Sequence, residues 1–221
     1  MTWYASTGLA EVFAPEQKRA RRVKIAVLLL ALVLSAGCGE RGAGLTQLRA
    51  NAVILAFGDS LTRGTGVALN NSYPAVLANL TGRKVVNAGV PGEVTAQALE
   101  RLPAELDKHK PDLVVLIHGG NDLLRRNSRQ TAANLREMIK LVRERGIEVV
   151  MLGVPAPSLI LRSAGFYADV AEETGTPIDD EALADILGRP SNKSDTVHPN
   201  GKGYALLAEA VQALLARHGA L

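Results

Sequence analysis

Three residues whose types can together cleave an ester stand at turns of this 221-residue chain. Ser60 lies in Gly-Asp-Ser-Leu directly after the apolar run 52–57, whereas Asp195 and His198 lie in Asp-Thr-Val-His near the C-terminus. A serine hydroxyl is a poor nucleophile until a base takes its proton, and an imidazole oriented by a carboxylate is the usual base. A spacing of three allows one turn to bring the Asp195 carboxylate against one ring nitrogen of His198, while the other nitrogen faces the nucleophile. The chemistry that this set predicts is nucleophilic attack on a carbonyl.

His198 is the one histidine of four that has an aspartate at this spacing and a Pro-Asn-Gly turn behind it. His109 and His218 are expected near the ends of helices, and His118 closes an apolar strand. Each motif also has an ordinary structural explanation. Gly-Asp-Ser can be a turn that leads into a helix N-cap, and Asp-x-x-His can be a helix start. The assignment therefore depends on the rest of the chain.

Acyl transfer also needs hydrogen-bond donors for the oxyanion that develops on the substrate. Gly92, in a Pro-Gly turn, can present a backbone N–H without a side chain in the way. Asn121 offers a side-chain amide after two glycines that permit close approach. The alternatives are a plain type II turn at Gly92 and an Asx turn that caps the next helix at Asn121.

Short apolar runs bounded by Gly, Pro or Asn predict buried parallel strands, and the helical patterns between them predict an α/β fold. The expected strands are 52–57, 85–86, 113–117 and 147–152. The expected helices are 72–80, 95–108, 128–145 and 201–218. The carboxyl ends of parallel strands share one edge of a sheet, so motifs far apart in the sequence can converge there.

The N-terminal part is typical of a secretion signal. Basic residues within 18–24 precede an uncharged apolar run from Ile25 to Ala36, which is shorter than the roughly 20 residues of a membrane-spanning helix. Cys38, the only cysteine, follows Ser-Ala-Gly and resembles the lipobox cysteine of bacterial lipoproteins. We expect a periplasm-facing lipoprotein of the bacterial cell envelope, held to the inner or outer membrane; an ordinary cleaved signal and an uncleaved anchor are the alternatives. The expected organisation is a signal peptide over 1–37, a tether over 38–50 and one hydrolase domain over 51–221.

The net charge of +3 comes from the leader and not from the domain. Residues 1–37 carry five of the 25 basic residues and two of the 22 acidic ones, which leaves 20 of each from Cys38 onward. A nucleic-acid-binding surface would need excess basic charge in the folded part. The sequence pI of about 9.1 is therefore no sign of nucleic-acid binding, and we expect no nucleic-acid partner.

Four blocks of the sequence, in this order, resemble the GDSL or SGNH hydrolase family. They are Gly-Asp-Ser-Leu at 58–61, the glycine turn near 92, Gly-Gly-Asn-Asp at 119–122 and Asp-x-x-His at 195–198. The resemblance covers about 52–215 and is closest to the bacterial acyl-CoA thioesterases, lysophospholipases and arylesterases. It implies a flavodoxin-like three-layer α/β/α sandwich with a mainly parallel sheet. The Gly-x-Ser-x-Gly elbow of the α/β-hydrolases is absent, because position 62 is Thr.

The resemblance also implies a role for each residue. The implied triad is Ser60, Asp195 and His198. The oxyanion donors would be the backbone N–H groups of Ser60 and Gly92 and the side chain of Asn121, although Gly89 lies in the same turn as Gly92 and competes for its role. The expected function is a serine esterase or thioesterase that acts on a small-molecule ester through an acyl-enzyme, without metal or cofactor.

Two other functions would use the same features. A carbohydrate O-deacetylase of the cell envelope needs the same catalytic parts and differs in its pocket walls, and a catalytically inactive lipoprotein would only bind an acyl or glycan ligand. Leu159 and Ile160, after the strand 147–152, predict an apolar pocket wall and a preference for acyl or aryl esters, unless they pack into the core beneath their loop. A glycan pocket should offer aromatic platforms, and only 4% of the residues are aromatic.

Overall fold

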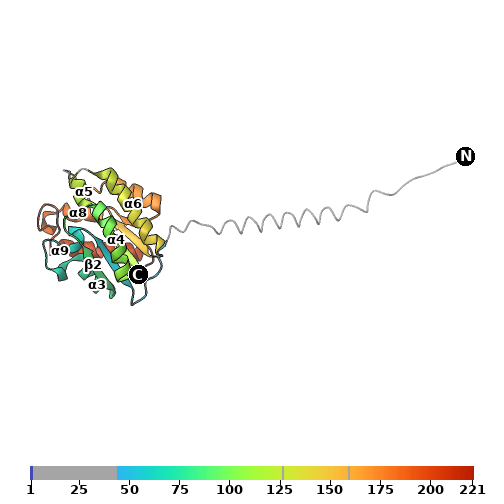
Figure 1. Ribbon diagram of the computed structural model, residues 1–221, viewed down its shortest axis with the longest axis horizontal. Helices are drawn as coiled ribbons and strands as arrows, with labels where there is room; N and C mark the ends of the chain where they lie inside the picture. Colours follow the sequence, from blue (N-terminus) through green and yellow to red (C-terminus); the bar gives the residue numbers. More distant parts are fainter. Residues whose placement is uncertain (2–43, 126, 159) are drawn as a thin grey trace. The chain divides into compact units, whose positions relative to one another are not determined.

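The computed structural model describes Met1 and residues 44–221, apart from 126 and 159 (Figure 1). Except for Met1, the predicted signal peptide 1–37 lies outside the described residues, as do Cys38 and Leu159. No helix in the described part of the chain is long and apolar enough to cross a membrane.

Five strands form one parallel sheet, in the order β2-β1-β3-β4-β5. They are β1 (Val53–Gly58), β2 (Lys84–Gly89), β3 (Leu113–Ile117), β4 (Glu148–Leu152) and β5 (Ile178–Asp179). β3 is buried along its whole length, which explains its uninterrupted apolar sequence Leu-Val-Val-Leu-Ile. From β1 the chain moves one way to β2 and the other way to β3, and ligands of such sheets bind beside this reversal, at the carboxyl ends of the strands.

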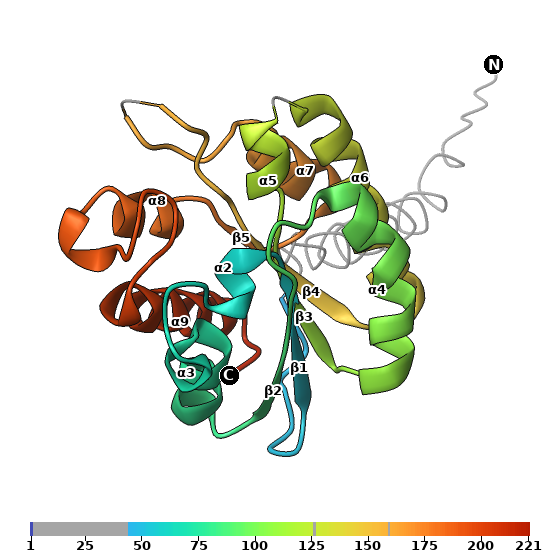
Figure 2. The same ribbon diagram turned by 60° about the vertical axis from the view of Figure 1, so that its left-hand side comes forward.

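Helices cover both faces of the sheet, so the expected three-layer α/β/α sandwich is confirmed (Figure 2). One layer contains α3 (Tyr73–Thr81), α8 (Ala182–Leu187) and α9 (Gly201–Arg217). The other contains α4 (Thr95–His109), α6 (Ser128–Glu144) and α7 (Phe166–Thr174). The remaining helices are short: α2 (Ser60–Arg63), η1 (Leu69–Asn71), α5 (Gly120–Leu124) and η2 (Pro190–Asn192). Of these, α2 and α5 directly follow β1 and β3 and carry residues of the candidate site.

The described end of the predicted tether packs on the domain. Leu45 and Leu48 are buried, at 8% and 6% exposure, and their N–H groups donate to the carbonyl oxygens of His218 and Ala220 at 2.7 and 2.9 Å. Two leucines three residues apart can bury apolar surface on a neighbouring element even within a short polar segment. In the described part of the chain, Leu45 and Leu48 thus pack with the residues near the C-terminus, on the N-terminal side of the predicted boundary at residue 51.

Candidate active site

Ser60 follows the carboxyl end of β1, an interior strand of the sheet, where the chain turns into a short helix. The Asp59 side chain caps α2 by accepting a hydrogen bond from the Leu61 N–H at 3.0 Å, and Ser60 is the first helical residue. Gly58 permits the close packing of α2 and β3 at this turn, because a Cβ there would lie 2.2 Å from Thr62 Oγ1 and 2.1 Å from the Ile117 carbonyl oxygen. The turn places Ser60 in the lining of an open cleft at the edge of the sheet.

His198 and Asp195 reach Ser60 from the loop that precedes α9. His198 Nε2 lies 2.9 Å from Ser60 Oγ, across 138 residues of sequence, and His198 Nδ1 lies 2.7 Å from Asp195 Oδ2. The other Asp195 oxygen accepts hydrogen bonds from the backbone N–H groups of Val197 and His198, each at 2.8 Å. The Asn200 side chain then caps α9. The structure thus brings together the three residues that the sequence analysis selected for the triad.

The hydrogen bonds of this set determine where its protons lie. Desolvation raises the pKa of Asp195, but hydrogen bonds from the His198 ring and from two backbone N–H groups outweigh it, so this pKa lies below its usual value. The ionised carboxylate binds a proton-bearing Nδ1, which leaves Nε2 with a lone pair directed at the Ser60 hydroxyl. In this arrangement His198 can accept the Ser60 proton, and the Asp195 charge can stabilise the imidazolium that results.

Gly92 and Gly89, the two candidates for the backbone oxyanion donor, lie in different surroundings. Gly92 is exposed, has a φ of 77°, lines the cleft, and has no atom within 4 Å of the place where a Cβ would be. Gly89 lies in β2, and a Cβ there would lie 2.1 Å from the Arg63 backbone nitrogen, so its role is to let α2 pack on the sheet. The geometry favours Gly92 as the donor.

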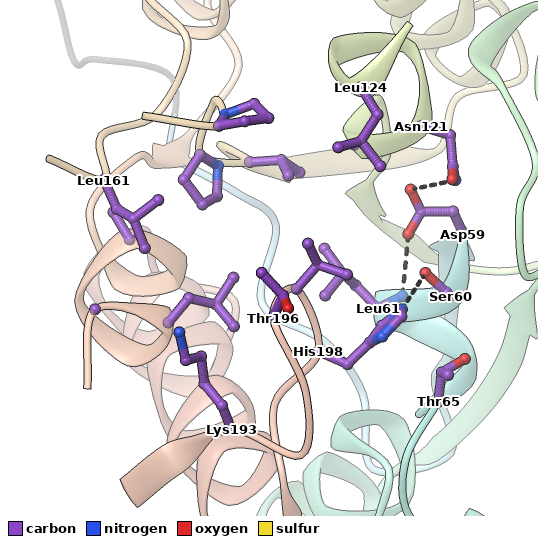
Figure 3. Close-up of a pocket in the computed structure, with 18 of the residues that line it drawn as sticks. Asp59, Ser60, Leu61, Thr65, Asn121, Leu124, Leu161, Lys193, Thr196 and His198 are labelled. Atoms are coloured by element: carbon purple, nitrogen blue, oxygen red, sulfur yellow. Dashed lines mark hydrogen bonds between the residues drawn. The ribbon is translucent and has the colours of Figure 1, made fainter. Parts of the chain in front are cut away.

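Asn121 points from α5 toward Asp59, the residue beside Ser60 (Figure 3). Its Nδ2 donates to the Glu93 carbonyl oxygen at 2.9 Å and to Asp59 Oδ2 at 3.3 Å. Asp59 is buried, and this burial raises its pKa. The main-chain contact orients the amide beside Ser60, and the contact with Asp59 occupies its second N–H. Donation to an oxyanion would require this second N–H to exchange Asp59 for the substrate oxygen.

A cleft of about 1160 Å³ extends from Ser60 and has largely apolar walls. The lining residues that follow β4 include Val154, Pro155, Pro157, Ile160 and Leu161, and Leu187 and Val197 also line the cleft. Ile160 is 71% exposed, so it does not pack into the core beneath its loop. The sequence analysis missed Arg189 and Lys193, two cations that line this cleft; Figure 3 shows Lys193 and Leu161 on the side away from Ser60. In the part of the chain that the structure describes, no three His, Cys, Asp or Glu side chains are grouped to hold a metal ion.

A second polar cluster, also missed, is centred on Glu93, the residue that follows Gly92 and whose carbonyl oxygen accepts from Asn121. Glu93 is bonded to both Arg101 and His118, and all three lie largely or wholly inside the domain. The only sequence signals were an acid directly after a Pro-Gly turn and a histidine that ends an apolar strand. Neither signal identifies its partner, because the three residues come from three separate elements.

Fold and site together identify a class of protein: a serine hydrolase that cleaves esters and has an α/β/α sandwich fold. Its serine lies where β1 turns into α2, and an asparagine amide lies nearby. The sequence profile of the GDSL-like lipase/acylhydrolase family matches residues 56–206. The chain belongs to this family.

Relatives with assigned activities agree with this class. The chain is 30% identical over 182 residues to an arylesterase of Vibrio mimicus, which covers 77% of this chain and 91% of the relative. It is also 30% identical over 165 residues to thioesterase 1/protease 1/lysophospholipase L1 of Escherichia coli strain K12, with coverage of 71% and 79%. The crystal structure of TesA is 29% identical, covers 75% of this chain and 99% of its own, and superposes with a TM-score of 0.69. The chain is accordingly a serine esterase or thioesterase.

Proposed function

We propose that this enzyme hydrolyses acyl or aryl esters, and the corresponding thioesters, through an acyl-enzyme on Ser60. The 2.9 Å contact between Ser60 Oγ and a His198 ring that is oriented by Asp195 carries the proposal. His198 Nε2 takes the Ser60 proton as Oγ attacks the carbonyl carbon, and then gives that proton to the leaving oxygen or sulfur. Water then attacks the acyl carbon and loses a proton to the same nitrogen. The bond from the acyl carbon to Ser60 Oγ breaks, Nε2 returns the proton to Oγ, and the acid is released.

The negative charge on the tetrahedral intermediate needs donors in fixed positions. We assign this role to the backbone N–H groups of Ser60 and Gly92 and to Nδ2 of Asn121. The support is that all three residues line one cleft and that a main-chain contact already orients the amide.

Labelling with a fluorophosphonate tests the nucleophile. We expect the label on Ser60, and we expect Ser60→Ala to lose both the label and all but about a thousandth of the activity while its thermal unfolding is unchanged. Ser158→Ala is the matched control, because this serine lines the same cleft. A label on another residue, or an active Ser60→Ala variant, would refute the assignment.

The substrate class follows from the cleft walls. The apolar segment 154–161 suits an acyl chain or an aryl group, and the relatives named for arylesterase, thioesterase and lysophospholipase activities point the same way. Acyl-CoA and lysophospholipids are therefore candidate substrates. An O-deacetylase of envelope carbohydrates is the second candidate, and a panel of p-nitrophenyl acyl esters, acyl-CoA, lysophospholipid and acetylated glycans distinguishes the two.

We also propose that the enzyme works in the bacterial cell envelope as a lipoprotein attached through Cys38. The support is the basic and apolar leader followed by Ser-Ala-Gly-Cys, since two acyl chains on one cysteine suffice for stable anchoring. Mass spectrometry of the mature N-terminus should find a lipidated Cys38, and Cys38→Ser should move the protein from membranes to the soluble fraction. An unmodified Cys38 would refute the anchor and leave the catalytic proposal intact.

A further inference from the structure

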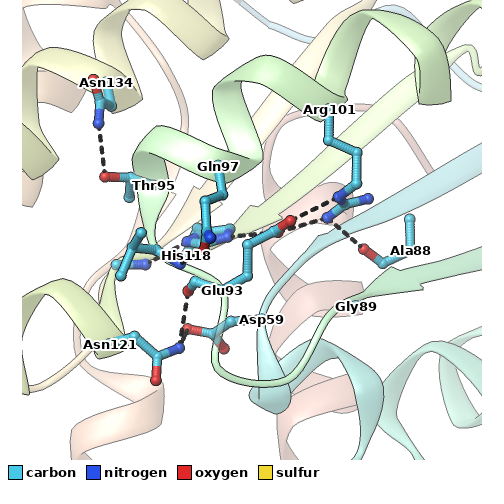
Figure 4. A network of polar contacts seen from close by, with 12 residues as sticks. Asp59, Ala88, Gly89, Glu93, Thr95, Gln97, Arg101, His118, Asn121 and Asn134 are labelled. Atoms are coloured by element: carbon cyan, nitrogen blue, oxygen red, sulfur yellow. Dashed lines mark hydrogen bonds and ion pairs between the residues drawn. The ribbon is translucent and has the colours of Figure 1, made fainter.

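Figure 4 shows the buried carboxylate of Glu93 near Arg101 and His118. Glu93 directly follows Gly92, and its side chain is only 6% exposed. Arg101 donates to it twice, from Nε to Oε1 at 2.8 Å and from Nη2 to Oε2 at 2.7 Å. His118 Nε2 lies 3.1 Å from Oε2. One side chain is thus bonded to helix α4 and to the residue that follows β3.

The partners of Glu93 are themselves held in place. Arg101 Nη2 also donates to the Ala88 carbonyl oxygen at 3.2 Å, which fixes the guanidinium at the carboxyl end of β2. His118 is fully buried, and its Nδ1 accepts a hydrogen bond from the Gly119 N–H at 2.9 Å. Nε2 therefore carries the ring proton and donates it to Glu93.

The Glu93 carboxylate is charged. Desolvation raises its pKa, but hydrogen bonds from Arg101 and His118, together with the positive charge of Arg101, more than offset this effect and lower the pKa to about 2. A buried ion pair is costly to break from one side only, because the remaining charge loses its partner. The charge and its hydrogen bonds therefore hold Glu93 in a single position.

The main chain of Glu93 takes part in the same connection. Its carbonyl oxygen accepts the 2.9 Å hydrogen bond from Asn121 Nδ2. An amide NH₂ group is planar, so fixing one N–H determines the direction of the other, which meets Asp59 Oδ2 at 3.3 Å, beside Ser60. Because Gly92 is the preceding residue, the position of Glu93 affects both candidate oxyanion donors at once.

We propose that Glu93 is a positioning residue for ester hydrolysis: its carboxylate, bound by Arg101 and His118, sets the spacing between the Gly92 N–H and the Asn121 amide. The inference rests on the proposed function and adds a residue that is not among those lining the cleft. Oxyanion donors act on the transition state more than on the bound substrate, so their displacement lowers kcat more than it raises KM.

Glu93→Gln and its matched control Glu105→Gln test the proposal. Glu105 contacts the same guanidinium, with Oε1 3.4 Å from Arg101 Nη1, and its ion pairs are with residues of α4. We expect Glu93→Gln to lower kcat roughly ten- to a hundredfold with KM within about threefold, since a displacement of about 1 Å can cost a hundredfold. Glu105→Gln should keep both constants within about twofold. An unchanged kcat in folded Glu93→Gln, a change in KM alone, or an equal loss in both variants would overturn the proposal.

Glu93→Asp covers the case in which Glu93→Gln does not fold. It keeps the negative charge that Arg101 requires but withdraws the carboxylate from His118, and we expect the same fall in kcat at nearly constant KM. Wild-type kinetics in this variant would overturn the positioning role. Fluorophosphonate labelling separates this failure from failure of the proposed function: normal Ser60 labelling with unaltered Glu93 variants removes only the positioning role, whereas an unlabelled wild-type Ser60 removes both.

Discussion

Two imidazole–carboxylate pairs lie at the carboxyl edge of this sheet, and they differ in what surrounds them. In the pair of His198 and Asp195 the side chains are 17% and 51% exposed. In the pair of His118 and Glu93 they are 0% and 6% exposed. The contact distances are similar, 2.7 Å and 3.1 Å, so distance alone does not distinguish a base from a structural histidine.

The second ring nitrogen makes the difference. His198 uses Nδ1 for its carboxylate and turns Nε2 to the Ser60 hydroxyl in the open cleft. His118 uses Nε2 for its carboxylate and Nδ1 for the Gly119 N–H, so no nitrogen is left for a substrate. A general base must exchange a proton with a reacting group. The reactive histidine is therefore recognised by a ring nitrogen that faces the nucleophile in an open cleft. A carboxylate partner alone does not distinguish it.

Replacing the two histidines tests the comparison directly and should give the largest effects. His198→Ala should lower kcat by a thousandfold or more and leave the unfolding midpoint nearly unchanged, because the lost group acts on the nucleophile. His118→Ala should instead lower the unfolding free energy by about 1–3 kcal/mol, since it leaves buried polar partners unpaired, and should lower kcat only by the roughly ten- to hundredfold expected when Glu93 is displaced. Steady-state kinetics and urea unfolding measure both. Comparable losses of unfolding free energy in the two variants would contradict the assignment of His198 as the base and His118 as a structural residue.

The next largest effect concerns Asn121, which contacts the main chain of Glu93 and the side chain of Asp59 beside Ser60. Asn121→Ala should lower kcat by roughly a hundredfold to a thousandfold with a smaller change in KM, because the donor acts on the transition state. The comparison is His118→Ala, in which the smaller kinetic loss expected from displacement of Glu93 leaves the amide itself in place. Equal kinetic losses in both variants would point to collapse of the structure around α5 and not to a missing oxyanion contact.

The cleft wall should produce a smaller effect that increases with chain length. If the acyl chain lies along 154–161, each added methylene from acetate to decanoate should gain up to about 0.8 kcal/mol, or about fourfold in kcat/KM, until the cleft is filled. Ile160→Ser and Leu161→Ser should flatten this series, whereas Leu80→Ser, an exposed leucine on α3, should not. A series that is flat in the wild type and unaffected by the wall variants would favour the O-deacetylase.

The smallest effect is on stability in acid, and it sharpens the difference between the buried and exposed carboxylates. The Glu93 pKa is lowered from 4.5 to about 2 in the folded protein, so the unfolded chain takes up its proton first. The stability that Glu93 contributes is complete above the unfolded pKa and is lost as the pH falls from about 4.5 toward about 2. Urea unfolding at pH 5 and pH 3 should therefore show a smaller acid loss in Glu93→Gln than in the wild type. Equal losses would show that another group is responsible.

Much of this site could be predicted because its residues follow strands whose pattern is clear. The run 113–117 matches β3 as predicted, and the other three predicted strands overlap β1, β2 and β4. The Glu93 cluster could not be predicted, because pairing across three elements leaves no periodic signal. The packing of Leu45 and Leu48 was missed for the same reason, and β5 has only two residues, too few for a pattern.

The separation of 138 residues between Ser60 and His198 also has a consequence for folding. Any growing chain that ends before residue 195 lacks both the base and its carboxylate, however well the first strands have paired. The loop that supplies them depends on α9, near the C-terminus, so hydrolytic activity should return among the last events of refolding, after helix formation and strand pairing. An unfinished or incompletely folded chain would carry the serine without its base. It could not hydrolyse cellular esters and thioesters until folding was complete.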